Sequence, residues 1–581
     1  MKRFRVEAGR LGRVWRLSKD ALLLSGAVSA AACTGALDSP TGMNPSAGGA
    51  SAQGGSTGIG GSAAGAGAVA GGGSGPVDTG LPGRSLIRRL SNVEYDATIK
   101  ALLGDATSYA SAFPTDSVVN GFTNNTDVQD VAPALAEQLL IAAEKVAAKA
   151  AQNPDALLGC KLADGDACIQ TFIERFGKRA WRRPLDAVER EDLLGVFRAG
   201  STSHGAVVGF KLLLEALLVS PSFLYRVEVG TPMGSEPYTA LTSWEVATRL
   251  SYFLTGTMPD EALFTAAAAD GLRTPEGIAA EAKRLLATPA AREQVASFFS
   301  GWLNLRAVER LERDKAQFPQ WSSTLPPLLM AETRAFTTQV VFEGAGDLKT
   351  LLTAPYTYGD PTLAALYGGT AGPAQNGIAR IDLPPAQRAG LLTQVSFLAT
   401  HAKEIQTDPV ARGKFVRERI LCQGIPAPPP ELMISAPEIT PGTTTRQRFV
   451  EHEANPVCAT CHTLIDPVGL AFENYDAAGA WRVEEQGRPI DASGDLTSTD
   501  VSAPLNGVVE MATKLAQSEM VSECFVRNWF RFAFGRGEGD EEAARIGTLA
   551  TEFRSADDKV LELMVTLTKS PDFRYLAKQV P

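Results

Sequence analysis

Apolar residues recur at helical spacing along most of the chain, and a capping box marks the start of two of the helices. Ser91 with Glu94, and Thr242 with Glu245, each stand directly before an apolar helical run. In a capping box each side chain bonds the backbone N–H of the other residue, which satisfies donors that the first turn leaves without partners. The predicted helices span 90–104 and 241–256.

Several segments of the chain resemble one another. Residues 219–225 are similar to 569–575, both at the end of a long apolar helix, and residues 296–302 are similar to 524–530. The two capping boxes are a further repeated feature. Repetition of this kind predicts duplicated helical modules.

Strand signals are few. The exception is the region 481–505, where residues 482–484 and 489–491 flank Gln486 and Gly487. A glycine-containing pair between two short extended segments is typical of a β-hairpin. The predicted fold class is therefore mainly α: a multidomain chain of helical modules with one small β-hairpin region.

The composition is that of a globular chain with a flexible N-terminal part. Its 581 residues are 44% apolar and 21% charged, enough for roughly three to five hydrophobic cores. Residues 34–82 are mostly Gly, Ala and Ser, and they predict a flexible tether with a root-mean-square reach of about 40 Å. The net charge of −10 offers no attraction for nucleic acid or anionic lipid, so neither is an expected partner.

The N-terminus is typical of an exported protein. Basic residues precede an apolar run, 21–32, which is too short to span a bilayer, and the run ends in Ala30-Ala31-Ala32-Cys33. This resembles a bacterial lipoprotein cleavage site with Cys33 lipidated. Because Leu or Val is more usual three residues before the cysteine, ordinary signal-peptidase cleavage is the alternative. No later stretch holds 18 consecutive apolar residues, so the membrane is expected to be reached only through the lipid anchor.

The most specific chemical motif is a single C-x-x-C-H, formed by Cys458, Cys461 and His462. This spacing lets two thiols add to the vinyl groups of one haem while the imidazole binds the iron from the proximal side. Zinc would require two further Cys or His ligands at short spacing, and a redox dithiol would require a βαβ context. Neither is evident in the sequence. One covalent haem c is the predicted cofactor.

The sixth iron ligand is not fixed by spacing. His401 is the preferred residue, because it follows an apolar helix that could hold it rigidly. His452 and Met433 are the alternatives: His452 is only six residues from the first motif cysteine, and Met433 lies in a Pro-rich loop. An open or water-bound iron is the fourth possibility. A Met ligand would raise the potential and a second His would lower it, whereas an open position would permit catalysis.

Residues near the motif have weaker signals. Asp466-Pro467 predicts a turn that ends a short helix carrying the motif. Arg412 and Lys414 are candidates to pair the haem propionates, with an exposed salt bridge as the alternative. Tyr475 and Trp481 are either haem-packing aromatics or ordinary core residues.

Four cysteines remain after lipid and haem are assigned, which in an oxidising compartment allows two disulfides in three connectivities. Cys160 and Cys168 flank a short turn-prone segment, so they are predicted to pair with each other. Cys422 and Cys524 then pair by elimination. The alternative is that some of the four are buried thiols that act as small apolar groups.

Further segments match the pattern of one group of proteins in the same order. They are 88–104, 172–176, 182–185, 220–223, 250–254, 259–260, 400–401, 409–410, 412–414, 428–430, 452–469, 473–476 and 529–581. From about residue 81 to its end, the chain resembles secreted multidomain proteins of planctomycetes and myxobacteria, in which helical domains of unknown function surround one cytochrome-c-like module. The resemblance implies a mainly helical multidomain fold. It implies little about activity, because the biochemistry of the family is largely undefined.

The function predicted from these features is electron transfer in the cell envelope by an exported, lipid-anchored monohaem cytochrome-like protein with an unidentified redox partner protein. Outer-membrane sorting is expected, because Thr34 and not Asp follows Cys33. The alternatives are a haem-dependent, peroxidase-like oxidoreductase and a scaffold that binds envelope components or polysaccharide with a structural haem. The predicted divisions are 1–32 (lipoprotein signal peptide), 33–82 (tether), 83–155, 156–230 and 236–370 (three helical modules), 386–500 (haem module) and 504–581 (C-terminal helical module).

Overall fold

The structure is a computed structural model that describes residues 82–84, 87–374, 377–426, 437–454, 456–539 and 542–578. All of these belong to one compact unit. Cys33, the predicted signal peptide and tether, Met433 and the side chain of His452 lie outside the described residues. The described chain is mainly helical with small sheets, which confirms the predicted fold class at this level. None of its helices is long and apolar enough to cross a membrane.

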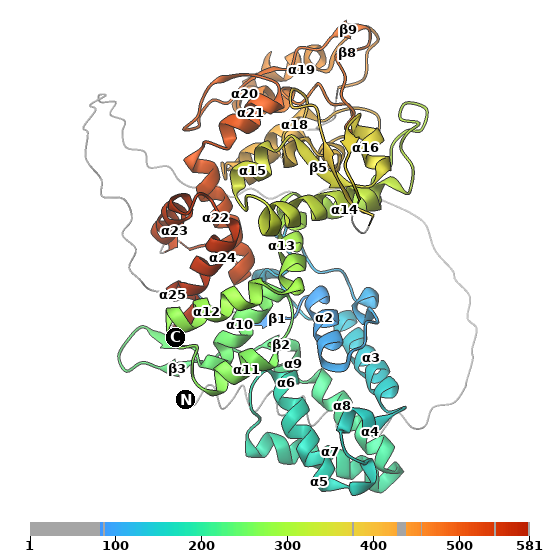
Figure 1. Cartoon of the computed structure of the whole chain (residues 1–581), viewed down its shortest axis with the longest axis vertical. Helices are drawn as coiled ribbons and strands as arrows, with labels where there is room; N and C mark the ends of the chain where they lie inside the picture. Colours follow the sequence, from blue (N-terminus) through green and yellow to red (C-terminus); the bar gives the residue numbers. More distant parts are fainter. Residues whose placement is uncertain are drawn as a thin grey trace, which may run out of the picture. The chain divides into compact units, whose positions relative to one another are not determined.

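Most elements before residue 227, in blue and teal in Figure 1, build one hydrophobic core, to which Tyr252, Met258 and Phe264 also belong. Leu139, Phe172 and Leu214 are among its buried residues. The pairs α7 with α8 and α3 with α8 pack against each other. The elements are β1 Arg88–Arg89, α2 Asn92–Leu103, α3 Pro133–Ala150, α4 Pro154–Leu158, α5 Asp166–Phe172, α6 Lys178–Trp181, α7 Ala187–His204, α8 Ala206–Val219, α9 Pro221–Leu224 and β2 Tyr225–Arg226.

A second and larger core joins the elements from residue 241 to residue 576. The elements of its first part, with two strands that precede them, are β3 Thr231–Pro232, β4 Tyr238–Ala240, α10 Ser243–Thr255, α11 Glu261–Ala268, α12 Pro275–Leu286, α13 Pro289–Trp302, α14 Leu325–Thr338, α15 Leu348–Thr353, β5 Tyr356–Gly359, α16 Pro361–Tyr367, β6 Thr370–Ala371 and β7 Ala379–Asp382. β5, β7 and β6 form an antiparallel three-stranded sheet in that order.

The rest of this core contains the predicted haem module and the C-terminal helices, in yellow to red in Figure 1. Its elements are α17 Val395–Thr400, α18 Pro409–Phe415, the π-helical turn η8 Val416–Ile420, α19 Thr445–Ala454, α20 Pro456–Leu470, β8 Glu484–Glu485, β9 Arg488–Pro489, β10 Ser493–Asp495, β11 Pro504–Asn506, α21 Val508–Leu515, α22 Glu519–Phe534, α23 Ala543–Ser555, α24 Val560–Lys569, α25 Pro571–Arg574 and β12 Tyr575–Ala577. β8 and β9 form the predicted hairpin around Gln486 and Gly487, both with positive φ.

The duplication predicted from the sequence has a structural counterpart. Both capping boxes are present, at the start of α2 and of α10. Each helix follows a short strand, and each strand pairs with the segment after a Ser-Pro-x-Phe turn: β1 with β2, and β4 with β12. Even the bond beside each strand is repeated, because Leu90 donates to the carbonyl of Leu224 (2.8 Å) and Leu241 to that of Arg574 (2.9 Å).

The third pair of similar segments lies on α13 and α22, which pack against each other. The rings of Phe298 and Trp529, one from each segment, stack with centroids 3.7 Å apart and an interplanar angle of 11°. Trp302 and Phe525 meet edge to face beside them. These residues are fully buried, so the two related segments together form the centre of the larger core.

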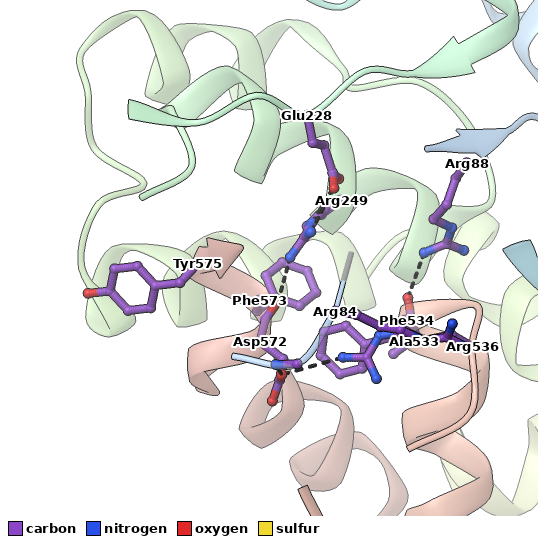
Figure 2. A pocket seen from close by; sticks show the side chains of 11 residues that line it. Arg84, Arg88, Glu228, Arg249, Ala533, Phe534, Arg536, Asp572, Phe573 and Tyr575 are labelled. Atoms are coloured by element: carbon purple, nitrogen blue, oxygen red, sulfur yellow. Dashed lines mark hydrogen bonds and ion pairs between the residues drawn. The ribbon is translucent and has the colours of Figure 1, made fainter. Parts of the chain in front are cut away.

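A buried cluster of ion pairs joins α10, at the start of the second repeat, to α25 at its end (Figure 2). Arg249 of α10 binds both carboxylate oxygens of Glu228, at 2.6 and 2.7 Å, and also donates to the backbone carbonyl of Asp572. Asp572 in turn pairs with Arg545 and accepts a bond from the backbone N–H of Gly83 (2.8 Å). The cavity among these groups measures about 20 Å³. It has room for one water molecule and not for a substrate.

Both predicted disulfides are present. Cys160 joins Cys168, and Cys422 joins Cys524 across a sequence separation of 102 residues. The second bond links the chain after η8 to α22, and so ties the predicted haem module to the C-terminal helices. Chain entropy predicts about 2–3 kcal/mol for the short loop and about 4–5 kcal/mol for the long one.

Glu332 of α14 is an uncompensated carboxyl in the larger core. Its side chain is fully buried and accepts bonds through Oε1 from Thr357 (2.9 Å) and Tyr367 (2.6 Å). Its other oxygen, Oε2, has no hydrogen-bond partner. Burial raises the pKa of Glu332 from its ordinary value of 4.5 to about 7.

The stability of the fold is expected to depend on pH through Glu332. Because folding raises the pKa of Glu332, the protonated carboxyl contributes fully to the free energy of unfolding below about pH 4.5. This contribution is lost as the pH rises to about 7. The loss amounts to about 3 kcal/mol at 1.36 kcal/mol per pH unit. The free energy of unfolding, measured with denaturant between pH 4.5 and 7.5, should fall with rising pH in the wild type and not in Glu332→Gln. Glu276→Gln, which alters an exposed carboxylate, should keep the pH dependence of the wild type. An unchanged pH dependence in Glu332→Gln would contradict the raised pKa of Glu332.

Candidate functional site

All three residues of the C-x-x-C-H motif lie on one helix, α20. Cys458, Cys461 and His462 are separated by three and four positions, so they share one face of the helix. All three side chains are partly exposed. Both cysteines carry free thiols, whereas the other four cysteines in the described part of the chain are joined in disulfides. The motif thus presents two reduced thiols and an imidazole together at the surface of the module.

His462 is oriented by a buried carboxylate one turn further along α20. Its Nδ1 lies 2.9 and 3.0 Å from the two carboxylate oxygens of Asp466. The Asp466 side chain is only 1% exposed, while that of His462 is 19% exposed. A carboxylate on Nδ1 fixes the tautomer in which Nε2 carries the lone pair, and it makes the imidazole a stronger electron-pair donor.

The predicted turn at Asp466-Pro467 is wrong. Pro467 lies inside α20, which continues to Leu470. The helix continues through the proline, even though the ring of Pro467 removes one intrahelical N–H donor. The consequence for the site is that Asp466 is a helical residue at position i+4 from His462, and not a loop residue.

α18 packs closely against α20 because each helix has a glycine at the contact. A Cβ on Gly413 would collide with the carbonyl of Ile465, and a Cβ on Gly469 with the carbonyl of Pro409. The two helices run antiparallel, since Arg417 in the following turn η8 donates to the carbonyl of Leu464 at 2.9 Å. The contact with α18 therefore holds the C-terminal half of α20 in place. The half that carries the motif continues beyond the contact with Arg417.

Arg412 does not have the role proposed from the sequence. It is fully buried and donates to five backbone carbonyls, at distances of 3.1 to 3.3 Å, those of Leu398, His401, Phe472, Tyr475 and Asp476. Its guanidinium is thus committed to the backbone and not to a haem propionate. Lys414 forms the alternative that the sequence allowed, a partly exposed salt bridge with Glu418 at 3.7 Å.

Arg417 is a buried cation next to the motif helix, and one of its nitrogen atoms has no hydrogen-bond acceptor. It donates to Leu464, Gln423 and Thr497, yet its Nη2 has no hydrogen-bond partner although it is buried. Desolvation lowers its pKa. A buried N–H without an acceptor, on a side chain that bonds the motif helix at Leu464, suits an anionic group such as a propionate better than it suits apolar packing.

His401 is buried at the end of α17, packed against the rings of Phe397 and Phe415 with centroids 4.6 Å away in each case. Its Nδ1 lies 3.0 Å from the carbonyl of Phe397, which places the proton on Nδ1 and leaves Nε2 unprotonated. Burial lowers its pKa to about 4, so the imidazole is neutral at pH 7. His401 is thus in the protonation state that a metal ligand needs, while its described contacts are to α17 and α18 and not to α20.

Tyr475 and Trp481 are core residues. Tyr475 is fully buried, and its ring meets that of Trp481 edge to face at 5.3 Å. The guanidinium of Arg388 lies 4.9 Å from the centre of the Tyr475 ring. Of the two interpretations left open by the sequence, ordinary packing is the one that the structure shows.

The residues of the motif are of the types that covalent haem attachment uses. Across the ranges that the structure describes, no group of three or more His, Cys, Asp or Glu side chains is placed to hold a metal ion. The two thiols, His462 and the buried Asp466 supply what covalent haem attachment and proximal ligation require. The role of Asp466 was not predicted from the sequence. Its i,i+4 spacing from His462 could have indicated the contact, because residues at this spacing are neighbours on a helix.

Five family models match the chain one after another, each described as a protein of unknown function. They cover residues 88–152 (DUF1587), 168–228 (DUF1595), 241–368 (DUF1592), 388–485 (DUF1588) and 503–573 (DUF1585). The model that covers the motif bears the name PSCyt3. No curated protein and no solved structure matches the chain. The chain is thus a multidomain helical protein with five consecutive segments similar to families of unknown function, in agreement with the organisation that the resemblance implied.

Proposed function

We propose that this protein carries one covalently attached haem on α20 and transfers electrons in the cell envelope. The observation that carries the proposal is the joint geometry of the motif: two free thiols one turn apart, next to an imidazole whose Nδ1 is held by the buried carboxylate of Asp466. The haem, when bound, supplies a one-electron redox centre. The resemblance to secreted cytochrome-like multidomain proteins supports the same assignment.

The residues of the chain have separate tasks in this proposal. Cys458 and Cys461 form the thioether bonds, and His462 binds the iron through Nε2. Asp466 holds the imidazole ring and increases its basicity. Arg417 offers its unpartnered Nη2 to a propionate. The clamp between α18 and α20 fixes the helix, so that the redox centre need not reorganise when it gains or loses an electron.

The proposal includes export. Cys33 is lipidated, the tether of residues 33–82 separates the folded part from the membrane, and an unidentified redox partner protein docks beside the motif. Two disulfides in the described chain support an oxidising compartment, because such bonds are rare in the bacterial cytosol.

A haem-dependent oxidoreductase is the second candidate, and Asp466 is the observation that favours it. Were a haem bound, the carboxylate of Asp466 would strengthen His462 as an electron-pair donor to the iron, and this would favour oxidative chemistry. The sixth ligand separates the two candidates. A protein ligand there favours electron transfer, and an open position favours catalysis.

Covalent haem attachment is the direct test. Expressed with cytochrome c maturation machinery, the full chain should keep haem through a denaturing gel and gain the mass of one haem. The double variant Cys458→Ala/Cys461→Ala should lose both signals while retaining the Cys160–Cys168 and Cys422–Cys524 disulfides. A wild-type mass without added haem would show that the motif has another role.

Asp466→Asn tests the role of the buried carboxylate. The amide is a weaker acceptor for the Nδ1 proton of His462, so the ferric state should lose stability and the midpoint potential should rise. A tenfold change in the ferric-to-ferrous equilibrium corresponds to about 60 mV for one electron, and a rise of roughly this size is expected in a spectroelectrochemical titration. The exposed Asp491→Asn variant serves as control and should leave the potential unchanged; equal shifts in both variants would argue against a specific role.

His401→Ala tests the sixth ligand. If Nε2 of His401 binds the iron, the visible spectrum of the loaded protein should change from low-spin to high-spin. His452→Ala should then leave it low-spin. The reverse result would assign the position to His452, and a low-spin spectrum in both variants would point to Met433. A high-spin wild type that binds CO would favour the oxidoreductase.

A further inference from the structure

Three sequence signals that the proposed function does not use meet in one pocket. They are Trp181-Arg182-Arg183-Pro184, the Ser-Pro-Ser-Phe turn of α9, and the capping box at the start of α10. The pocket measures about 400 Å³, a size typical of sites for small molecules, which range over roughly 300–1,000 Å³. It lies between the segments 168–228 and 241–368, which match different family models. Such a junction is a common place for a ligand site.

The walls of the pocket are aromatic and aliphatic. Trp181 and Trp244, one from each segment, are only half-buried. Trp244 packs against both hydrophobic cores, so the pocket follows the seam between them. Val227 and Val229 line it with 45% and 65% of their surface exposed. A ring-shaped ligand would cover these apolar surfaces.

The polar lining is mostly cationic. Arg182, Arg183 and Arg226 line the pocket with a single carboxylate, that of Glu245. Both oxygens of Glu245 are already occupied, because Oε1 accepts from the backbone N–H groups of Val229 (2.6 Å) and Gly230 (3.0 Å) and Oε2 from the capping-box N–H. Glu245 is therefore a structural acceptor and not a group left to receive a ligand.

Two of the arginines also have hydrogen-bond partners within the protein. Arg183 holds Glu189 with two bonds of 2.6 and 2.9 Å. Arg182, which has a positive φ of 59°, donates to the backbone carbonyls of Ser222, Phe223 and Tyr225. Their charges remain next to the pocket, but their N–H groups are used.

Arg226 differs from both. Its side chain is only 2% exposed, its Nη2 lies 3.8 Å from the carboxylate of Glu94, beyond hydrogen-bond distance, and its guanidinium lies 5.0 Å from the centre of the Tyr252 ring. Neither Nε nor Nη2 has a hydrogen-bond partner. A buried guanidinium with two unused donors is costly unless an acceptor reaches it. An anionic ligand that enters the pocket would supply this acceptor.

We propose that this pocket binds a small organic acid built as a carboxylate on a six-membered ring, with the ring against Trp181 and Trp244 and the carboxylate toward Arg226. The carboxylate satisfies the guanidinium by charge-assisted hydrogen bonds, and the ring covers the indole surfaces. Uronic sugars and aromatic acids share this chemistry. The proposal is independent of haem attachment, because no residue of the pocket belongs to the predicted haem module.

Calorimetric titration of the full chain with two acids distinguishes the sources. The probes are D-galacturonate and 4-hydroxybenzoate, with D-galactose and 4-hydroxybenzyl alcohol as the neutral analogues. At least one acid should bind saturably with a Kd in roughly the micromolar to millimolar range, and its neutral analogue at least about tenfold more weakly. Binding of galacturonate alone identifies a sugar ligand, and binding of hydroxybenzoate alone an aromatic one. Absence of saturable binding by both acids, or equal binding of acid and neutral analogue, overturns the proposal.

Variants of lining residues test whether the acid binds in this pocket. Trp244→Ala should weaken the acid about tenfold, whereas Trp481→Ala, which removes a half-buried tryptophan of another module, should not. Because a substitution of Arg226 or Trp244 can disturb folding, the exposed Val229 provides a second test. Val229→Asp should weaken binding roughly fivefold more than Val229→Asn does, because both variants remove the apolar side chain but only the aspartate repels the carboxylate. Unchanged affinity in both Trp244→Ala and Val229→Asp would place the binding elsewhere and overturn the proposal.

Discussion

Buried arginines that donate to backbone carbonyls are the interaction on which the rest of this structure depends. Many short helices and turns leave carbonyl groups inside the protein, and a buried carbonyl without a donor destabilises the fold. Arg412 satisfies five of them, and Arg388 bonds those of Thr393 and Gly479, which lie far apart in the chain. Arg182 performs the same task for the turn after α9. A guanidinium suits this task because it carries five donors on one rigid plane.

The candidate haem site depends on this framework. Arg412 ties the end of α17 and the segment 472–476 to α18, and α18 holds α20 through the contact that Gly413 and Gly469 permit. The clamped half of α20 is buried, and its other half presents the thiols and His462 to solvent. This division suits covalent attachment, since the thiols must be reachable while the imidazole must be fixed. Asp466 connects the two halves, because it is buried on one side and bonded to His462 on the other.

The duplicated units explain how distant parts of the chain come together. In each unit a strand before a capped helix pairs with the strand that follows a Ser-Pro-x-Phe turn, and the second unit encloses some 330 residues between these two ends. Pairing of β4 with β12 and the Arg249–Glu228–Asp572 cluster close this long loop, and the Cys422–Cys524 bond is a cross-link within it. The pocket with Arg226 lies where the first unit meets the second, so its walls exist only when both are folded.

Features that depend on near neighbours in the chain could be predicted from the sequence. Both capping boxes, the hairpin at Gln486-Gly487, the helical character and the short Cys160–Cys168 loop are local features, and the structure confirms each of them. Only the tertiary structure decided the roles of Asp466 and Arg412. Packing against α18 keeps α20 helical through Pro467, where local propensity predicts a turn, and it thereby makes Asp466 a partner of His462. Arg412 bonds carbonyls up to 64 residues away, and no local pattern encodes which carbonyls folding leaves buried without a donor.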